Sequence, residues 1–190
     1  LGVDTAWCKF DSTTYYPSVI YHGNNAANIR YSVCANSNLA SCRTSAGWTT
    51  SNVVASAAPV HMQMNVRSSV TQDKVNVLIK PAAGTALTTY SSASGCHSPG
   101  AFTVGANVVG AATAGTAWAK LMRDAAGLFH VVANNATTNV VYMNSNNSNI
   151  QTTTWNAAGT IETVTLPAVG AGAGGADIAQ SYGMIYSSYG

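Results

Sequence analysis

The chain has 190 residues, of which 47% are hydrophobic and only 7% are charged, with a net charge of +2. Disorder requires high charge and low hydrophobicity, so this composition predicts one folded domain over residues 1–190. The charge is too weak and scattered to predict a surface for nucleic acid or anionic lipid, and no apolar run reaches the roughly 18 residues of a membrane span.

Short β-like segments separated by turn residues occupy most of the chain. β-branched and aromatic residues fill these segments, and Asn, Asp, Ser and Gly stand between them. We expect four-stranded modules at 4–54, 59–109 and 116–164. Their strands are expected, in chain order, at 5–10, 15–22, 28–34, 48–54, 61–67, 74–80, 87–92, 101–109, 117–123, 128–133, 139–143 and 152–156 with a continuation to 164. No long apolar period follows a helix cap, so the sequence predicts an all-β protein.

Aromatic landmarks recur once in each module. Thr-Ala-Trp at 5–7 returns at 116–118, a displacement of 111 residues, which is twice about 55. The third strands are expected to carry Tyr31, Tyr90 and Tyr142, and the fourth strands Trp48, Phe102 and Trp155. One such sheet cannot bury both of its faces, so it must pack on its neighbours. The sequence therefore predicts a propeller-like array of four-stranded antiparallel modules.

The last residues predict a module that stops halfway. After a Gly- and Ala-rich connector at 167–175, residues 176–190 contain two further strand patterns, so about three and a half modules are visible. Native proteins cover unpaired strand edges. We therefore expect a homo-oligomer in which the terminal segment packs on a neighbouring chain. The alternative is a blade shared by the N- and C-terminal strands.

The four cysteines bear on the compartment. Cys34 and Cys42 bracket one loop of Asn, Ser and Ala, and a disulfide between them would favour an oxidising compartment. The sequence therefore predicts a secreted or cell-surface protein. Cys8 and Cys96 either pair across modules, or Cys8 is an ordinary buried residue. Because the chain begins with Leu1 rather than Met, we expect an excised mature domain.

The acidic residues predict a protein that is not an enzyme. Glycoside hydrolysis usually takes two carboxylates at a defined separation, but Glu162 is the only glutamate. Asp11, Asp73 and Asp124 fall where the first strand of each module turns into the second, and Asp is a common turn residue. Arginines such as Arg123 stand in separate strand segments, so no arginine cluster is predicted.

Neither cofactor nor metal is predicted. The glycine pattern at 170–175 lacks the helix that a dinucleotide site requires, so it is a linker. The histidines lack the spacing of metal ligands. His22 and His130 are expected at nearly the same position of their second strands.

Aromatic and amide side chains suggest a surface that binds sugars. A sugar is held by a ring face against its C–H groups and by amides against its hydroxyls. Asn-rich turns join the second and third strands on one face of a propeller; turn geometry alone is the alternative explanation for them. The candidate ligand-binding residues are His22, Asn24, Asn25, Asn134, Asn135, Tyr182 and Tyr186. The tryptophans sit at repeat positions and are expected mostly in the core: Trp7, Trp48, Trp118 and Trp155.

The first module resembles the sialidase-type (BNR-like) propeller repeat of bacterial surface and secreted proteins. The segments that carry the likeness are Pro-Ser-Val-Ile-Tyr at 17–21, Gly-Asn-Asn at 23–25, Ile-Arg-Tyr-Ser-Val-Cys at 29–34 and Gly-Trp-Thr at 47–49. Trp48 and Trp155 keep the aromatic residue of the family's Asp-box, but no Asp stands at the expected place before either. The resemblance implies a propeller fold and carries over no particular activity.

The low charge and the small residues also resemble the receptor-binding tips of trimeric bacterial and phage fibres, which favours a homotrimer. We therefore expect an extracellular, non-enzymatic recognition or adhesion domain, lectin-like, that binds a surface glycan or receptor. The alternatives are a secreted sialidase-like hydrolase, which an arginine cluster converging with Glu162 would favour, and a structural spacer.

Overall fold

We analysed a computed structural model of the chain. It describes residues 3–23, 27–34, 39–56, 59, 61–67, 70–82, 85–108, 119–135, 139–157, 159–163, 176–181 and 184–189. For residues 39, 134, 135, 139, 162, 163, 176–181 and 184–189 the description covers the backbone alone.

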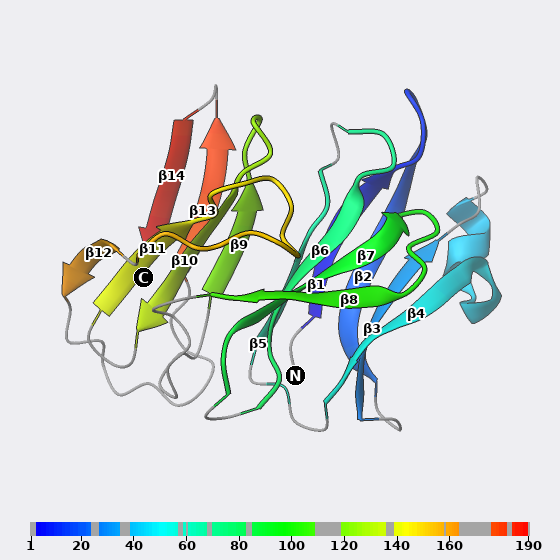
Figure 1. Cartoon of the computed structure of the whole chain (residues 1–190). Coiled ribbons are helices and arrows are strands. Elements are labelled where there is room, and N and C mark those ends of the chain that lie inside the picture. Colours follow the sequence, from blue (N-terminus) through cyan, green and yellow to red (C-terminus); the bar gives the residue numbers. More distant parts are fainter. Residues whose placement is uncertain are drawn as a thin grey trace.

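Three four-stranded antiparallel sheets and one two-stranded hairpin make up the fold, and in each the strands pair in chain order (Figure 1). Sheet 1 holds β1 (Val3–Lys9), β2 (Tyr15–Gly23), β3 (Asn28–Cys34) and β4 (Trp48–Ala55). Sheet 2 holds β5 (His61–Asn65), β6 (Lys74–Lys80), β7 (Thr88–Gly95) and β8 (Phe102–Asn107). Sheet 3 holds β9 (Ala119–Arg123), β10 (Phe129–Asn135), β11 (Asn139–Asn144) and β12 (Gly159–Thr163). The hairpin is β13 (Ala176–Ser181) with β14 (Met184–Tyr189), and two short 3₁₀ helices, η1 (Leu39–Arg43) and η2 (Ser45–Gly47), precede β4.

The all-β class and the four-stranded modules are thus confirmed. The fourth strand of the third module was placed too early, because residues 152–156 form a turn with one isolated bridge from Trp155 to Ser145. In sheets 1 and 2 the repeated aromatic residue begins the fourth strand: Trp48 pairs with Cys34 of β3, and Phe102 pairs with Ser92 of β7.

The three sheets stack face to face. We call the face of a sheet that is turned toward the preceding module its leading face, and the opposite face its trailing face. Between sheets 1 and 2 lies a first core: Cys8, Tyr16, Ile20, Ile29, Tyr31, Val33, Val53, Met62, Met64, Val66, Val75, Val77, Ile79 and Cys96. Between sheets 2 and 3 lies a second core: Leu78, Leu87, Val108, Ala119, Leu121, Phe129, Val131, Ala133, Val141, Met143, Ile150 and Trp155.

Strand β6 shows why the middle sheet lacks a clean polar alternation. Val75, Val77 and Ile79 point into the first core, and Leu78 points into the second, since successive side chains point to opposite faces. A strand that is buried on both faces needs apolar residues at consecutive positions.

The first strands lie side by side along the stack, β1 next to β5, β5 next to β9, and β9 next to β13. Side chains join them where backbone pairing is absent. The Met64 amide of β5 donates to Asp4 Oδ2 of β1 at 2.9 Å. Gln63 of β5 donates through Nε2 to the Leu121 carbonyl of β9, and its Oε1 accepts from the Leu121 amide. These bonds hold the modules in register.

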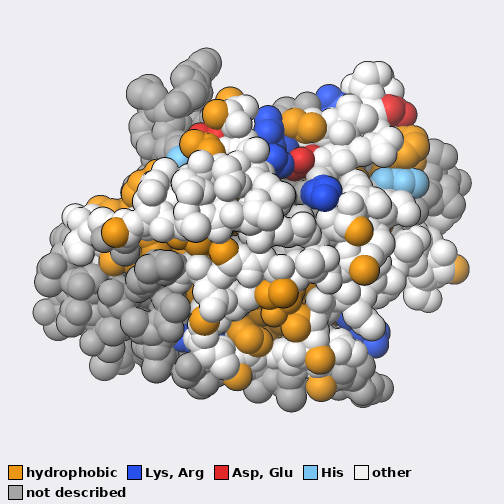
Figure 2. Space-filling view, in the orientation of Figure 1, with side chains coloured by type: hydrophobic (Ala, Val, Ile, Leu, Met, Phe, Trp, Pro, Cys, Tyr) orange, Lys and Arg blue, Asp and Glu red, His pale blue; other side chains and the backbone are white. Residues whose placement is uncertain are grey.

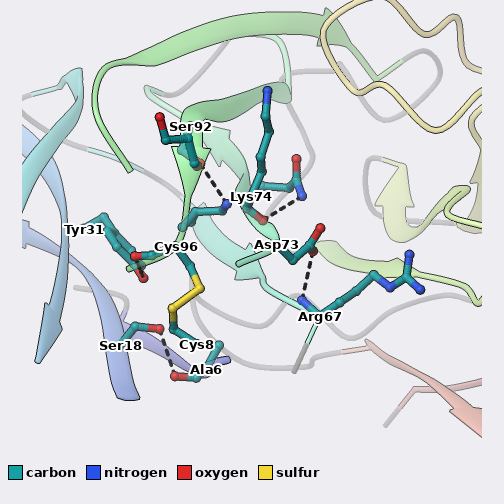
Figure 3. Close-up of a disulfide and its surroundings, with 12 residues drawn as sticks. Ala6, Cys8, Ser18, Tyr31, Arg67, Asp73, Lys74, Ser92 and Cys96 are labelled. Carbon is teal, nitrogen blue, oxygen red and sulfur yellow. Dashed lines mark hydrogen bonds between the residues drawn. A yellow bond between two sulfur atoms is a disulfide. The ribbon is translucent and has the colours of Figure 1, made fainter. Parts of the chain in front are cut away.

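Both pairs of cysteines form disulfides. The predicted Cys34–Cys42 bridge is confirmed, and Cys8 pairs with Cys96 across the first junction, where the Tyr31 hydroxyl donates to the Cys96 carbonyl at 3.0 Å (Figure 3). Two disulfides are consistent with the oxidising compartment that the sequence predicts. In the part of the chain that the structure describes, no helix is long and apolar enough to cross a membrane.

Two expectations about individual positions were wrong. Trp7 is not a core residue: it is 55% exposed, because it points away from sheet 2 on the outermost sheet. His22 and His130 do not share a position, since His22 pairs with Ile29 beside the β2–β3 turn whereas His130 pairs with Met122 beside the β9–β10 turn. Trp155 is buried, Trp48 is half-buried, and Trp118 lies outside the described residues.

Candidate functional site

A cleft of about 220 Å³ opens between sheets 2 and 3, at the end where the first strand of each module turns into the second. We call it the junction cleft. Figure 2 shows Lys or Arg side chains beside an acidic side chain over this junction. The cleft is lined by Asp73, Lys74, Asn76, Ser91, Arg123, Ser148, Asn149 and Ile150.

The cleft forms where the second core ends. On the trailing face of β6, the alternation that points Leu78 into the core points Asn76 and then Lys74 toward sheet 3. The apolar packing of β6 against sheet 3 ends at Leu78. Asn76 and Lys74, the preceding residues on the same face, are polar and cannot be buried there without hydrogen-bond partners. Asn76 is buried and finds its partners locally: Ser91 Oγ donates to Asn76 Oδ1 at 3.0 Å, and Asn76 Nδ2 donates to the Lys74 carbonyl at 3.2 Å.

An ion pair crosses the cleft from one sheet to the other. Arg123 Nη1, at the end of β9, donates to Asp73 Oδ1 at 2.8 Å. The other oxygen, Asp73 Oδ2, accepts the Arg67 amide at 3.1 Å. Arg123 is fixed further by its Nε, which donates to the Gly127 carbonyl at 3.0 Å, and by the Phe129 ring beneath its guanidinium. The pair therefore belongs to the wall of the cleft, and its two charges offset each other.

Lys74 gives the cleft its net charge. Its side chain is exposed, and its ammonium has no partner among the described residues. In Figure 3 the side chain extends away from the carboxylate of Asp73. With the ion pair neutral as a unit, one positive charge remains at the rim of the cleft.

The loop between β11 and β12 forms the opposite rim. Asn147 Oδ1 accepts the Asn149 amide at 2.9 Å, and Asn149 Oδ1 accepts the Gln151 amide at 3.1 Å, so asparagines close two successive turns. The loop exposes Ser148 and Asn149 and directs Ile150 into the second core. Hydroxyl and amide groups thus stand above an apolar floor.

Of the sequence-predicted binding residues, His22 is the one whose side chain the structure describes, and it lies outside this cleft. His22 is half-buried at the opposite end of its sheet, with Nε2 2.9 Å from the Ser56 carbonyl. Asn24, Asn25 and Tyr182 lie outside the described residues. Asn134 and Asn135 end β10 and Tyr186 lies in β14, with side chains outside the description.

Sequence reasoning missed the residues of the cleft. It assigned Asp73 to a turn and left Arg123 without a partner, because nothing in a sequence pairs two residues 50 positions apart. Lys74 and Asn149 carried no motif. The usable signal was the recurrence of Asp beside the first turn of each module, since that turn is where the cleft lies.

A second polar cluster sits on the trailing face of sheet 3. His130 Nε2 lies 3.1 Å from Asp124 Oδ2, and His130 Nδ1 lies 2.6 Å from Tyr142 Oη. Burial alone would raise the pKa of Asp124, but hydrogen bonds from His130 and the Leu128 amide outweigh it and hold the pKa below its usual value. Burial and the Asp124 charge raise the pKa of Tyr142, which keeps the phenol protonated.

Comparison with protein-family models and with curated proteins finds no match for this chain. Within the described ranges no three His, Cys, Asp or Glu side chains gather in a way that could hold a metal ion. The chemistry of the cleft must therefore be judged from its own residues.

Proposed function

We propose that the chain is an extracellular, non-enzymatic recognition domain of propeller-like modules that binds a surface glycan in the junction cleft. The observation that carries the proposal is a hydroxyl- and amide-lined cleft with one uncompensated lysine. Lys74 would hold an acidic group of the glycan, and Ser148 and Asn149 would bind its hydroxyls.

The dimensions and the rim of the cleft support a sugar-sized ligand. Sites for larger small molecules usually measure roughly 300–1,000 Å³, so about 220 Å³ suits one saccharide unit. Ile150 closes the base of the cleft but is itself buried in the second core, so the hydroxyl and amide groups of the rim are the groups that a sugar would contact. The rigid ion pair of Asp73 and Arg123 keeps the two walls at a fixed separation.

The arrangement of the modules supports the propeller-like part of the proposal. First strands lie side by side and sheets stack face to face, as innermost strands and blades do in a propeller. A homo-oligomer is part of the same proposal.

The carboxylates favour binding over hydrolysis. Asp73 is the carboxylate that lines the cleft, and both of its oxygens already accept hydrogen bonds, whereas glycoside hydrolysis usually takes two free carboxylates. The Asp124–His130–Tyr142 cluster is the feature that a hydrolase would use, but a protonated phenol is a poor nucleophile. We expect no hydrolysis of a sialoside or another glycoside, and activity abolished by Glu162→Gln would contradict the non-enzyme assignment.

A glycan array followed by calorimetry of the best ligand tests binding. Lys74→Met should weaken the affinity about tenfold or more, because a hydrogen bond to a charged group contributes about 1.5–3 kcal/mol. Asn149→Ala should weaken it roughly two- to tenfold, because a neutral hydrogen bond contributes about 0.5–1.5 kcal/mol. Lys9→Met is the matched control, since Lys9 lies over the Tyr15 ring on sheet 1 and the change removes the same charge. Absence of glycan binding at millimolar concentration, or binding that neither cleft substitution changes, would contradict the proposal.

A further inference from the structure

The leading face of sheet 1 is the one leading face that no described sheet covers. On sheet 2 the corresponding residues Met62 and Met64 are at most 5% exposed, because sheet 1 packs over them. On sheet 1, Val3 is 64% exposed, Trp7 55% and Tyr15 41%. The leading faces of sheets 2 and 3 are thus buried, whereas that of sheet 1 is exposed.

The exposed residues form one continuous surface. Strand register places Trp7 of β1 opposite Pro17 of β2, Val3 opposite Tyr21, and Tyr15 one step along the same face from Pro17. Directly opposite and diagonal neighbours on one face of an antiparallel pair touch. We define the open face as Val3, Trp7, Tyr15, Pro17, Val19 and Tyr21; Thr5, opposite Val19, and Lys9, opposite Tyr15, are the polar residues of β1 on the same face.

The chain's own terminal hairpin does not reach this face. Strand β13 lies beside β9 and β10, on the trailing side of sheet 3, and Figure 1 shows the hairpin and sheet 1 at opposite ends of the stack. There it covers a face whose Val132 and Val140 are fully buried. The trailing face of sheet 3 is therefore covered by the hairpin, whereas the leading face of sheet 1 has no described sheet over it.

We propose that the open face is the docking site for a second copy of this chain, which stacks head to tail so that its terminal hairpin end packs on sheet 1. The argument is continuity with the existing junctions. At both of them the trailing face of one module covers the leading face of the next with apolar side chains. The open face is the next leading face in that series, and Trp7 and Tyr15 are the residue types that dominate such contacts.

The number of modules favours two copies over the three that the likeness to fibre tips suggests. Each chain contributes three four-stranded sheets and one two-stranded hairpin. Two chains stacked head to tail would supply eight stacked units, six four-stranded sheets and two hairpins, at the upper end of the roughly four to eight blades usual for a closed propeller, whereas three chains would supply twelve. A head-to-tail contact that closes after two copies leaves no open face on either. This proposal does not depend on the ligand of the junction cleft.

Sedimentation equilibrium on the 190-residue chain tests it. The expected mass is about 39 kDa, twice the 19.5 kDa of one chain. Trp7→Asp and Tyr15→Asp should each weaken association by on the order of 30-fold or more, since buried aromatic residues carry most of the energy of an interface. Val104→Asp is the matched control, because Val104 is 57% exposed on β8, away from the open face, and the change introduces the same charge.

A wild-type mass of 19.5 kDa at about 100 µM, roughly a hundredfold above a micromolar Kd, would overturn the proposal. A three-copy mass would overturn the two-copy ring, and a dimer unchanged by both Asp substitutions would overturn the assigned surface. If a variant does not fold, hydrogen exchange of the wild-type protein tests the assigned surface instead. The backbone amides of β1 should become protected as the protein concentration rises. Equal exchange at all concentrations would contradict the proposed docking on sheet 1.

Discussion

The two junctions of the stack hold similar sheets together by different means. Sheets 1 and 2 meet in an apolar core that the Cys8–Cys96 disulfide closes, with Tyr31 hydrogen-bonded to its edge. Sheets 2 and 3 lack a disulfide and rely on an apolar core, the Gln63 bridge and the ion pair of Asp73 with Arg123. Within the part of the chain that the structure describes, the junction cleft lies at the polar junction. The glycan site that we propose therefore depends on the polar junction rather than on the covalent one.

The largest expected effect is at the covalent junction. Replacing Cys8 and Cys96 together by Ala should lower the free energy of unfolding by about 4.6 kcal/mol in the chain-entropy model, because the bridge joins residues 88 apart. The Cys34 and Cys42 pair, 8 apart, is the control and should cost about 2.5 kcal/mol. Urea denaturation measures both. Equal losses for the two pairs would show that the first bridge does not tie the sheets together.

Removing the ion pair should weaken the polar junction. Arg123→Met leaves the Asp73 carboxylate, only 9% exposed, without its charged partner, and we expect a loss of about 3 kcal/mol, at the low end for a buried pair since both groups touch solvent. Asp73→Asn in the Arg123→Met background should recover part of that loss, because no unpaired charge remains. Thermal unfolding of the four variants measures the coupling, and additive losses would contradict a direct interaction.

Acid should act on the polar junction through His61. Burial, followed by the charge of Lys120, lowers the pKa of this β5 side chain to about 4, from an ordinary value of 6.5. Between pH 6.5 and 4 His61 therefore binds a proton in the unfolded chain but not in the folded chain, so the free energy of unfolding falls as the pH falls through this window. The loss should reach about 2–3 kcal/mol. Urea denaturation at pH 7 and at pH 4 measures the loss. His61→Gln should reduce the difference in free energy of unfolding between the two pH values by this amount. The same difference in wild type and variant would show that His61 is not the group responsible.

The smallest expected effect tests the close packing beside the cleft. A Cβ on Gly105 of β8 would lie 2.4 Å from the Ile150 carbonyl and 2.7 Å from Thr89 Oγ1. Gly105→Ala should therefore push the β11–β12 loop outward and cost about 2 kcal/mol. It should also weaken glycan binding, because Ser148 and Asn149 stand on that loop. Ala106→Gly, the neighbouring position, is the control for flexibility of β8, and wild-type stability in Gly105→Ala would show that the loop gives way freely.

Local patterns were enough to predict the strands and their order. Turn residues between β-branched segments marked all four strands of sheets 1 and 2, and Cys34 and Cys42 stood close enough in sequence to suggest their bridge. Trp155 misled the assignment of the last strand of sheet 3, because the side-chain oxygens of Asn149 and Asn146 accept hydrogen bonds from backbone amides and hold that segment in a turn.

The sequence by itself determined the all-β class, the repeat and the Cys34–Cys42 bridge, because each depends on residues near one another in the chain. Only the tertiary structure decided which cysteine meets Cys8, which tryptophan stays exposed and where a cleft opens. Those features arise where one sheet faces another, and the stacking of sheets brings together residues such as Asp73 and Arg123 whose separation carries no local signal. Trp7 shows the same limit: its repeat position is a core position only when another sheet lies over it.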